Sequence, residues 1–414
     1  MKNINSKRPW IIVDGYSSGS LYVDLLNKIG VVTYHVQSSR IIPDFYLKTF
    51  DKSKYEENFI YESDLNTLLD ELKVLEPAVI IAGCEPGVKL ADQLSEHLGT
   101  PSNGTKYSQA RRDKYEMVQS LVKHGVKAAQ TYRVSSYQAL ADAIEVIGFP
   151  VVIKPTASAG SDGVYICMSE NEAQKAFDDV YLKEDRLGKT NDDVIVQELL
   201  NGKQYIVNTV SYDGKHYAVE IWIDHRIDTG SEYIYDHEKL IHNITELEQS
   251  IVNYTFDVLD ALNINYGPCH VELMVNDGIP TLIEVGSRPA GGINHETMFK
   301  AQGFSHVSAA IDCYLNPKEP SFTKYKVNQK EVLAVALISN SEGYLKQLNG
   351  VSKIHALPSF DYLTGLPALG SYVPVTKDIF SQPGLLMLSH ESEEQITKDL
   401  KTFRELEKDL FIMD

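Results

Sequence analysis

Short apolar runs alternate with amphipathic stretches along the first hundred residues. The runs 10–13, 31–36 and 78–83 have the length and composition of buried strands, whereas 20–29, 65–75 and 87–98 carry apolar residues at helical spacing. Strands that alternate with helices are typical of a parallel sheet covered by helices. The pattern therefore predicts an α/β domain over residues 1–113.

Two loops of this domain follow predicted strands. Residues Gly15 to Gly19 follow the first strand, and 83–87, which include Glu85, follow the run 78–83. Ligands of open α/β sheets bind at the carboxyl ends of the strands, so we expect both loops to contact a substrate. Gly15 to Gly19 lacks the Gly-x-Gly-x-x-Gly spacing of a dinucleotide-binding loop, which argues against that ligand.

A strand that ends in a lysine is predicted at 149–153, because the apolar run there is followed by Lys154 and then by small residues up to Gly163. Small residues let backbone N–H groups approach an anion closely, and the lysine adds a positive charge. The lysine precedes the glycines, unlike the lysine of a P-loop. The pattern indicates a clamp for nucleotide phosphates, and a plain strand with a glycine-serine turn is the alternative.

A β-hairpin is predicted from the strand-like segments 267–275 and 279–285, which Asn276-Asp277-Gly278 joins. Each segment contains a glutamate, Glu272 and Glu284, among apolar residues. Burying a carboxylate is costly unless it is paired or bound to a metal. With the oxygens of a triphosphate, the two carboxylates would suit Mg²⁺, or Mn²⁺ in its place. The alternative is that both glutamates face solvent on an edge hairpin.

Together these motifs resemble the ATP-grasp superfamily of carboxylate–amine ligases over roughly residues 10–390. The resemblance implies an α/β (α+β) ATP-grasp fold in four parts. These are an N-terminal Rossmann-like domain at 1–113, a small lid subdomain at 114–205, a central sheet with the metal site at 206–320, and a C-terminal lobe at 321–414.

The resemblance also implies an ATP site. Its residues would be the phosphate lysines Lys114 and Lys154, the lid loop residues Ser158, Ser161 and Gly163, the backbone of Glu198 and Leu200 for adenine, and Gln204 for ribose. The chain departs from the family pattern at Gln197 and Gln204, where carboxylates are common. It departs again in Glu284-Val285-Gly286-Ser287-Arg288, where Gly286 replaces an asparagine, so that the number of metal ions stays open.

The type of reaction depends on which group accepts the γ-phosphoryl group of ATP. The chain lacks the His-Arg-Asp loop of a protein kinase, and a carboxylate acceptor needs no base because it is ionised at pH 7. We therefore expect phosphoryl transfer to a carboxylate, then attack of an amine on the acylphosphate. Arg288 would hold the carboxylate and stabilise the oxyanion, helped by the backbone of Gly291 and Gly292. His237 is a candidate for removing the amine proton, and a plain surface loop is the alternative.

Within the superfamily, the order of the lobes and the turn at 288–292 resemble the bacterial L-amino-acid ligases, which join two free amino acids into a dipeptide and release ADP and phosphate. Gly291 and Gly292 contribute no side chain to an acceptor pocket, which favours larger acceptors. Arginine as the donor would suit acids at Glu85 or Asp236. The alternatives are a biotin carboxylase-like or purine-pathway ligase, and a non-catalytic ATP-sensing protein.

The composition of the chain narrows the range of possible binding partners. The chain has 414 residues, of which 43% are hydrophobic and 23% charged, so it can bury a large core. A net charge of −18 argues against nucleic-acid partners. The first eight residues contain no apolar segment, and no run approaches the ~20 residues that span a bilayer, so we expect a cytoplasmic enzyme with small-molecule partners. Members of the family often form homodimers. The four cysteines (Cys84, Cys167, Cys269 and Cys313) lack metal-ligand spacing, and we expect reduced core residues.

Overall fold

The computed structural model describes residues 8–157, 163–184, 190–228, 233–292, 294–324 and 330–414. The N-terminal domain is built on a parallel sheet in the order β3-β2-β1-β4, as the alternation of strands and helices predicted. Its strands are β1 (Trp10–Val13), β2 (Thr33–Gln37), β3 (Asn58–Ile60) and β4 (Val79–Ala82). Its helices are α1 (Ser20–Lys28), α2 (Asp44–Leu47), α3 (Leu65–Lys73) and α4 (Val88–Leu98), with short 3₁₀ turns at Ser17–Gly19, Lys52–Lys54 and Glu85–Gly87.

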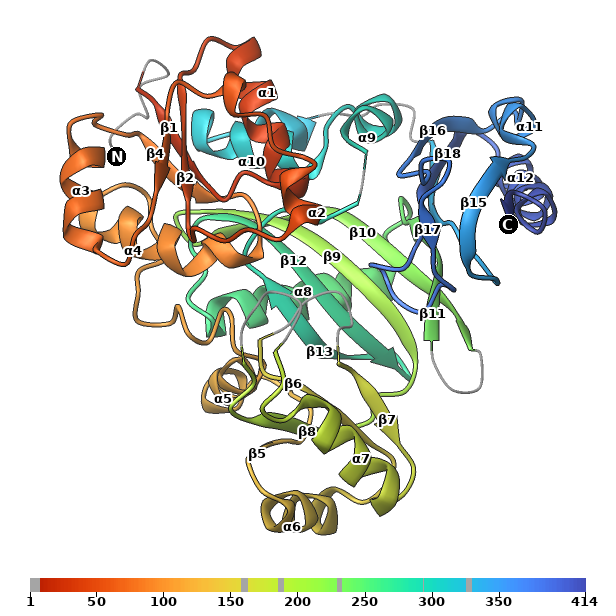
Figure 1. Ribbon diagram of the computed structural model, residues 1–414. Helices are drawn as coiled ribbons and strands as arrows, with labels where there is room; N and C mark the ends of the chain where they lie inside the picture. Colours follow the sequence, from red (N-terminus) through yellow and green to blue (C-terminus); the bar gives the residue numbers. More distant parts are fainter. Residues whose placement is uncertain (1–7, 158–162, 185–189, 229–232, 293, 325–329) are drawn as a thin grey trace.

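The lid is a separate antiparallel sheet in the order β5-β8-β6-β7, which lies below the central sheet in Figure 1. Its elements are β5 (Thr131–Val134), α6 (Tyr137–Ile147), β6 (Val151–Pro155), β7 (Tyr165–Cys167), α7 (Glu170–Val180) and β8 (Val194–Glu198). Helix α5 (Lys114–Lys123) buries Met117 and Leu121 in the core of the central sheet. The lid sheet therefore begins after α5, although the sequence places the start of the lid at residue 114.

The central sheet has the strand order β13-β12-β9-β10-β11-β14-β18-β16. Its first five strands in chain order are β9 (Lys203–Tyr212), β10 (Lys215–Asp228), β11 (Tyr233–Leu240), β12 (Gly267–Asn276) and β13 (Ile279–Gly286), and the helices beside them are α8 (Glu246–Ala261), α9 (His295–Gln302) and α10 (His306–Leu315). The β12–β13 hairpin is confirmed. Asp277 and Gly278 adopt φ values of 50° and 77°, the left-handed conformations that a two-residue hairpin turn requires.

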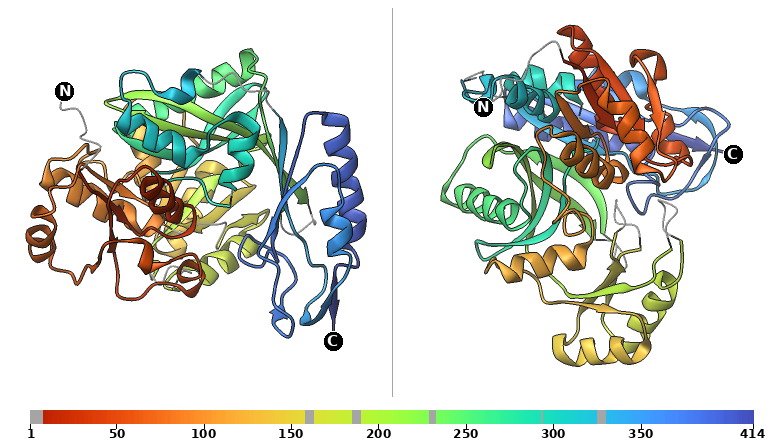
Figure 2. Two further views of the ribbon diagram at one scale, coloured as in Figure 1. Left: turned by 90° about the horizontal axis from the view of Figure 1, so that it is seen from above. Right: turned by 90° about the vertical axis from the view of Figure 1, so that its left-hand side faces the viewer.

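The C-terminal lobe continues the central sheet. Strands β14 (Glu331–Ala336), β16 (Phe360–Thr364) and β18 (Leu385–His390) add to it beyond β11, so that residue 321 does not begin a new sheet. The lobe also has a three-stranded sheet of β15 (Gly343–Leu348), β17 (Tyr372–Val373) and β19 (Phe411–Met413), and a 3₁₀ turn (Ser321–Lys324) precedes it. Helices α11 (Val351–His355) and α12 (Glu393–Glu407) lie on the outer side in Figure 2.

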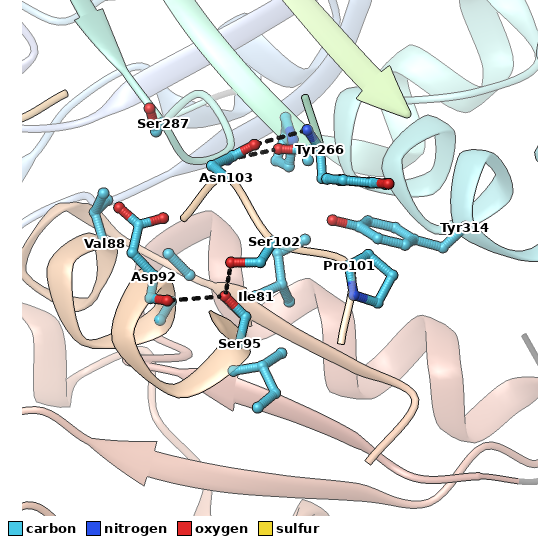
Figure 3. A pocket seen from close by; sticks show the side chains of 15 residues that line it. Ile81, Val88, Asp92, Ser95, Pro101, Ser102, Asn103, Tyr266, Ser287 and Tyr314 are labelled. Atoms are coloured by element: carbon cyan, nitrogen blue, oxygen red, sulfur yellow. Dashed lines mark hydrogen bonds between the residues drawn. The ribbon is translucent and has the colours of Figure 1, made fainter. Parts of the chain in front are cut away.

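Buried polar contacts fix the N-terminal domain onto the central sheet. Arg111 is fully buried, and its guanidinium donates to the Oδ2 atom of Asp92 at 2.9 Å and to the carbonyl of Leu262 at 3.1 Å. Asn103 accepts from the amide of Tyr266 at 2.8 Å, beside a small cavity of about 30 Å³ (Figure 3). These hydrogen bonds pair buried polar groups across the junction between the two parts. They hold the N-terminal domain in place against the central sheet.

Two predictions from composition are tested by the structure. All four cysteines are buried and unpaired, as expected for core thiols. Within the described ranges, the structure contains no helix with both the length and the apolar character that a membrane crossing demands.

Candidate active site

A cleft of about 290 Å³ lies where the N-terminal domain meets the central sheet. Both loops that were predicted to contact a substrate line it, through Ser17 and Ser18 from the first loop and residues 83–85 from the second. From the sheet side the cleft is lined by residues of β9 to β13 and of the turn that follows β13: Gln204, Ile206, Asp224, Tyr235, Glu238, His270, Glu272, Glu284, Arg288, Pro289, Gly291 and Gly292.

Glu272 and Glu284 are direct cross-strand partners in the β12–β13 hairpin, and both line the cleft. Side chains that face each other in this way are about 5 Å apart at their Cβ atoms. Without a cation two such carboxylates would repel, so their partners are informative. The Oε2 atom of Glu284 lies 2.8 Å from the Nζ atom of Lys114, which brings the predicted first phosphate lysine to the predicted metal site.

Glu272 is held by two polar side chains of the same sheet. His270 contacts its Oε1 atom at 3.2 Å, and the Gln204 amide donates to its Oε2 atom at 2.9 Å. His270 is in turn fixed by Asn208 at 2.9 Å. Burial alone would raise the pKa of the Glu272 carboxyl, but the His270 hydrogen bond and the charge of Arg226 outweigh burial and lower it. Glu272 is therefore ionised at neutral pH.

Lys154 is the next-to-last residue of β6, which ends at Pro155, and its side chain is buried. It donates to the Oε1 atom of Gln197 at 2.8 Å, and Gln197 donates to Thr131 at 2.8 Å. Burial and the nearby charge of Lys114 lower the pKa of Lys154 to about 8. The amide at Gln197 thus holds the lysine without a counter-charge, which leaves the positive charge available to an anion.

The residues present fit a divalent cation of the kind that ATP-grasp enzymes use. Glu272 and Glu284 supply hard oxygen donors from adjacent strands, and no third acid or histidine completes a metal cluster among the described residues. Two protein carboxylates leave most of an octahedron to other oxygens, which suits Mg²⁺ bound with phosphates. When bound, such an ion would neutralise phosphate oxygens.

Gly286 provides space for an ion pair. The Nε atom of Arg288 lies 3.2 Å from the Oε2 atom of Glu85, and a Cβ atom at Gly286 would be 3.1 Å from both the Cζ atom of Arg288 and that oxygen. Arg112 also pairs with Glu85. Burial works to raise the pKa of Glu85, but Arg112 and Arg288 lower it. An asparagine at this position would therefore crowd the arginine and the glutamate, which would have to shift by a few tenths of an ångström.

The predicted nucleotide contacts fall at the lid and its junction with the sheet. Glu198 ends β8, where its amide donates to the carbonyl of Gln130 at 3.0 Å, and Leu200 follows half-buried before β9. Gly163 adopts a φ of 67°. Ser158 and Ser161 lie outside the described residues. Gln204, predicted for ribose, lines the cleft but is engaged with Glu272.

Two predicted residues lie apart from the cleft. Asp236 accepts from the Nε atom of Arg404 at 3.0 Å, and His237 contacts Asp236 at 2.9 Å and stacks on His225. Glu238 lines the cleft, and successive strand residues point to opposite faces, so the neighbouring His237 faces away. The geometry gives His237 no access to an amine in the cleft, and the Asp236 carboxylate is already paired.

Sequence reasoning missed Asp224 and Glu238. They are direct partners across β10 and β11, and both line the cleft. The available signal was that each acid lies in a short run of charged and polar residues, 224–226 and 236–239. Such runs also occur on ordinary solvent-facing segments, which is why they did not indicate a site.

The chain is similar to several known proteins. A family model described as an ATP-grasp domain matches residues 147–296, which span the end of the lid helix α6, the two glutamates and Arg288. The chain thus contains an ATP-grasp domain and is an ATP-dependent ligase that forms amide bonds.

Two relatives and one solved structure are similar to it. Dapdiamide A synthase of Enterobacter agglomerans is 27% identical over 423 residues, 99% of this chain and 98% of that protein. Alanine–anticapsin ligase of Bacillus subtilis (strain 168) is 27% identical over 215 residues, 47% of this chain and 45% of that protein. The crystal structure of an L-amino acid ligase from Bacillus licheniformis has a TM-score of 0.77 at 18% identity and covers 99% of both chains, which establishes the fold.

Proposed function

We propose that this enzyme joins two L-amino acids into a dipeptide through an aminoacyl phosphate. The observation that carries the proposal is that one cleft holds Arg288 together with the facing pair Glu272 and Glu284, whose second member contacts Lys114. A centre for phosphate oxygens and a centre for a carboxylate are thus combined in one cavity. The relatives named above support amino-acid substrates.

In the first step, a carboxylate oxygen of the donor attacks the γ-phosphorus of ATP, the bond to the bridging oxygen breaks, and ADP leaves. Lys114 and Lys154 offset the charge of the phosphate oxygens. Arg288 holds the donor carboxylate in line, because its planar guanidinium suits paired oxygens. Its contact with Glu85 fixes the guanidinium in the cleft before the substrate arrives.

In the second step, the amine of the acceptor attacks the carbonyl carbon of the acylphosphate. The carbon–nitrogen bond forms, inorganic phosphate leaves, and the nitrogen loses one proton to solvent or to the departing phosphate. Arg288 stabilises the oxyanion of the tetrahedral intermediate. Gly291 contributes no side chain, and the described atom nearest to a Cβ there would be the Ser17 Oγ atom at 4.0 Å. The acceptor side of the cleft is correspondingly open to large side chains.

The test is product analysis without a chosen substrate. The enzyme is incubated with ATP, Mg²⁺ and a mixture of the twenty amino acids, and products are identified by mass while phosphate release is followed. Dipeptides that form in step with phosphate support the proposal. ATP hydrolysis that bicarbonate stimulates and amino acids do not would indicate another carboxylate–amine ligase, and nucleotide binding without any ADP would indicate a sensor.

A further inference from the structure

A row of acidic residues in the cleft has no role in the phosphoryl chemistry described above. Asp224 on β10 and Glu238 on β11 are cross-strand partners and line the cleft. The ladder shifts register between His225 and Arg226, so that Tyr235 rather than Asp236 pairs with Arg226. This β-bulge turns Tyr235 into the cleft beside the two acids.

One oxygen of this pair is buried without a partner. Asp224 has 7% of its surface exposed, and its Oδ2 atom accepts from the Nε atom of Arg226 at 2.7 Å. Its Oδ1 atom has no hydrogen-bond partner. Buried carboxylate oxygens are normally satisfied, so an unsatisfied oxygen on the wall of a cavity indicates a donor that arrives with a ligand.

Charge in this part of the cleft is also unbalanced. Among the described residues, Arg226 is the one cation that forms a salt bridge with Asp224. Its guanidinium lies over the Tyr235 ring, with the Cζ atom 4.3 Å from the ring centroid. The carboxylate of Glu238 makes no hydrogen bond or ion pair with the described residues, although its backbone pairs within the sheet. Burial, and then the charge of Asp224, raise the pKa of the Glu238 carboxyl. A cation bound between Asp224 and Glu238 would offset the repulsion between the two carboxylates and allow both to ionise.

We infer that Asp224 and Glu238 bind the positively charged side chain of a basic amino-acid substrate. An ammonium or guanidinium group suits this pair, because its several N–H donors can reach carboxylates that face the cleft from two adjacent strands. This inference rests on the proposed function, because it names the substrate class of the same cleft.

The position of the pair favours a side-chain cation over an α-ammonium group. Strand β10 is two strands from β12 in the sheet, so Asp224 is roughly 10 Å from the strand that carries Glu272. An α-ammonium group is attached one carbon from the reacting carboxyl group. A guanidinium or ε-ammonium group at the end of a long side chain can span the separation.

The test measures binding as well as turnover. Titration calorimetry compares arginine with citrulline, and lysine with norleucine, on the full-length enzyme. Each pair keeps the α-amino and α-carboxyl groups and differs in the side-chain charge. We expect arginine or lysine to bind about tenfold more tightly than its neutral counterpart, the scale of one charge-assisted hydrogen bond. Asp224→Asn and Glu238→Gln should remove this preference and leave the binding of the neutral amino acid unchanged.

Glu393→Gln is the matched control, because it removes one carboxylate that pairs with Lys239 on the surface, outside the cleft. Citrulline that binds as tightly as arginine, together with norleucine that equals lysine, would overturn the inference, and so would an unchanged preference in both variants. Failure of the proposed function is a separate result: no amino acid would stimulate ADP formation, whereas charge-selective binding that depends on Asp224 would still support the cation site.

Discussion

The Nε atom of Arg288 lies 3.2 Å from the Oε2 atom of Glu85, which joins the turn after β13 to a loop of the N-terminal domain. Glu85 is 203 residues away in the sequence, so the contact exists once the two domains have docked. In the proposed reaction, Arg288 holds the donor carboxylate and stabilises the oxyanion.

Arg288→Ala should lower kcat by about a hundredfold to a thousandfold, the range found when one oxyanion donor is lost. Arg288→Lys should recover little activity, since an ammonium group cannot make paired hydrogen bonds. Initial rates of ADP formation with the best amino-acid pair test this, and a melting curve shows whether the fold survives. Wild-type rates in the alanine variant would remove Arg288 from the mechanism.

Gly286→Asn restores the family residue and should nevertheless reduce activity. The new Cβ atom would be 3.1 Å from both the Cζ atom of Arg288 and the Oε2 atom of Glu85, so it should displace their contact. We expect a fall in kcat about as large as that of Arg288→Ala. Gly291→Ala is the control. Its new Cβ atom would be 4.0 Å from the Ser17 Oγ atom, so kcat should fall much less than in Gly286→Asn. Higher activity in the asparagine variant would show that Gly286 had cost the enzyme a metal ligand.

Nucleotide affinity should fall as the pH rises above about 8, the pKa to which burial and Lys114 lower Lys154. A bound triphosphate favours the charged lysine, so binding must take up a proton once the free lysine is neutral. The loss approaches about tenfold per pH unit above the pKa. Titration of a non-hydrolysable ATP analogue from pH 7 to pH 9 measures it. Lys154→Met should bind weakly with a flat profile, and a flat wild-type profile would contradict the role of Lys154.

Asp92→Asn should destabilise the whole protein without touching the cleft. The Arg111 side chain is completely buried, and its Nη2 atom lies 2.9 Å from the Oδ2 atom of Asp92. Removing the carboxylate charge leaves a buried guanidinium uncompensated, a loss of about 3 to 5 kcal/mol in the free energy of unfolding. Urea denaturation measures it. Asp24→Asn breaks an exposed pair with Lys54 and should change stability by about 1 kcal/mol or less. Equal effects of the two substitutions would refute the importance of the junction.

Local patterns predicted the parts of the site that local chemistry determines. The turn Asn276-Asp277-Gly278 and the apolar strands around Glu272 and Glu284 specify a hairpin, and its register then places the two acids opposite each other. Lys154 lies one residue before the end of its strand, close to the predicted position. The parallel N-terminal sheet was also predicted correctly, because the alternation of strands and helices is a local pattern in the sequence.

Features that depend on distant packing were not visible in the sequence. Helix α5 has the pattern of any amphipathic helix, so its sequence does not show whether it packs on the lid or on the central sheet. In the structure, Met117 and Leu121 pack into the core of the central sheet. The bulge after His225, which aims Tyr235 into the cleft, has no distinctive residues of its own. From the sequence, Gly286 was interpreted as the loss of a metal-side amide. The sequence does not show that the side chain of Arg288 occupies the space beside this glycine.

Isotope transfer tests the central claim most directly. The donor amino acid is labelled with ¹⁸O in its carboxylate and incubated with ATP, Mg²⁺ and the acceptor, and the released inorganic phosphate is analysed by mass. An acylphosphate intermediate requires that one donor oxygen leaves with the phosphate, so the account predicts one ¹⁸O atom in the phosphate for each dipeptide formed. Dipeptide formation with unlabelled phosphate would contradict it.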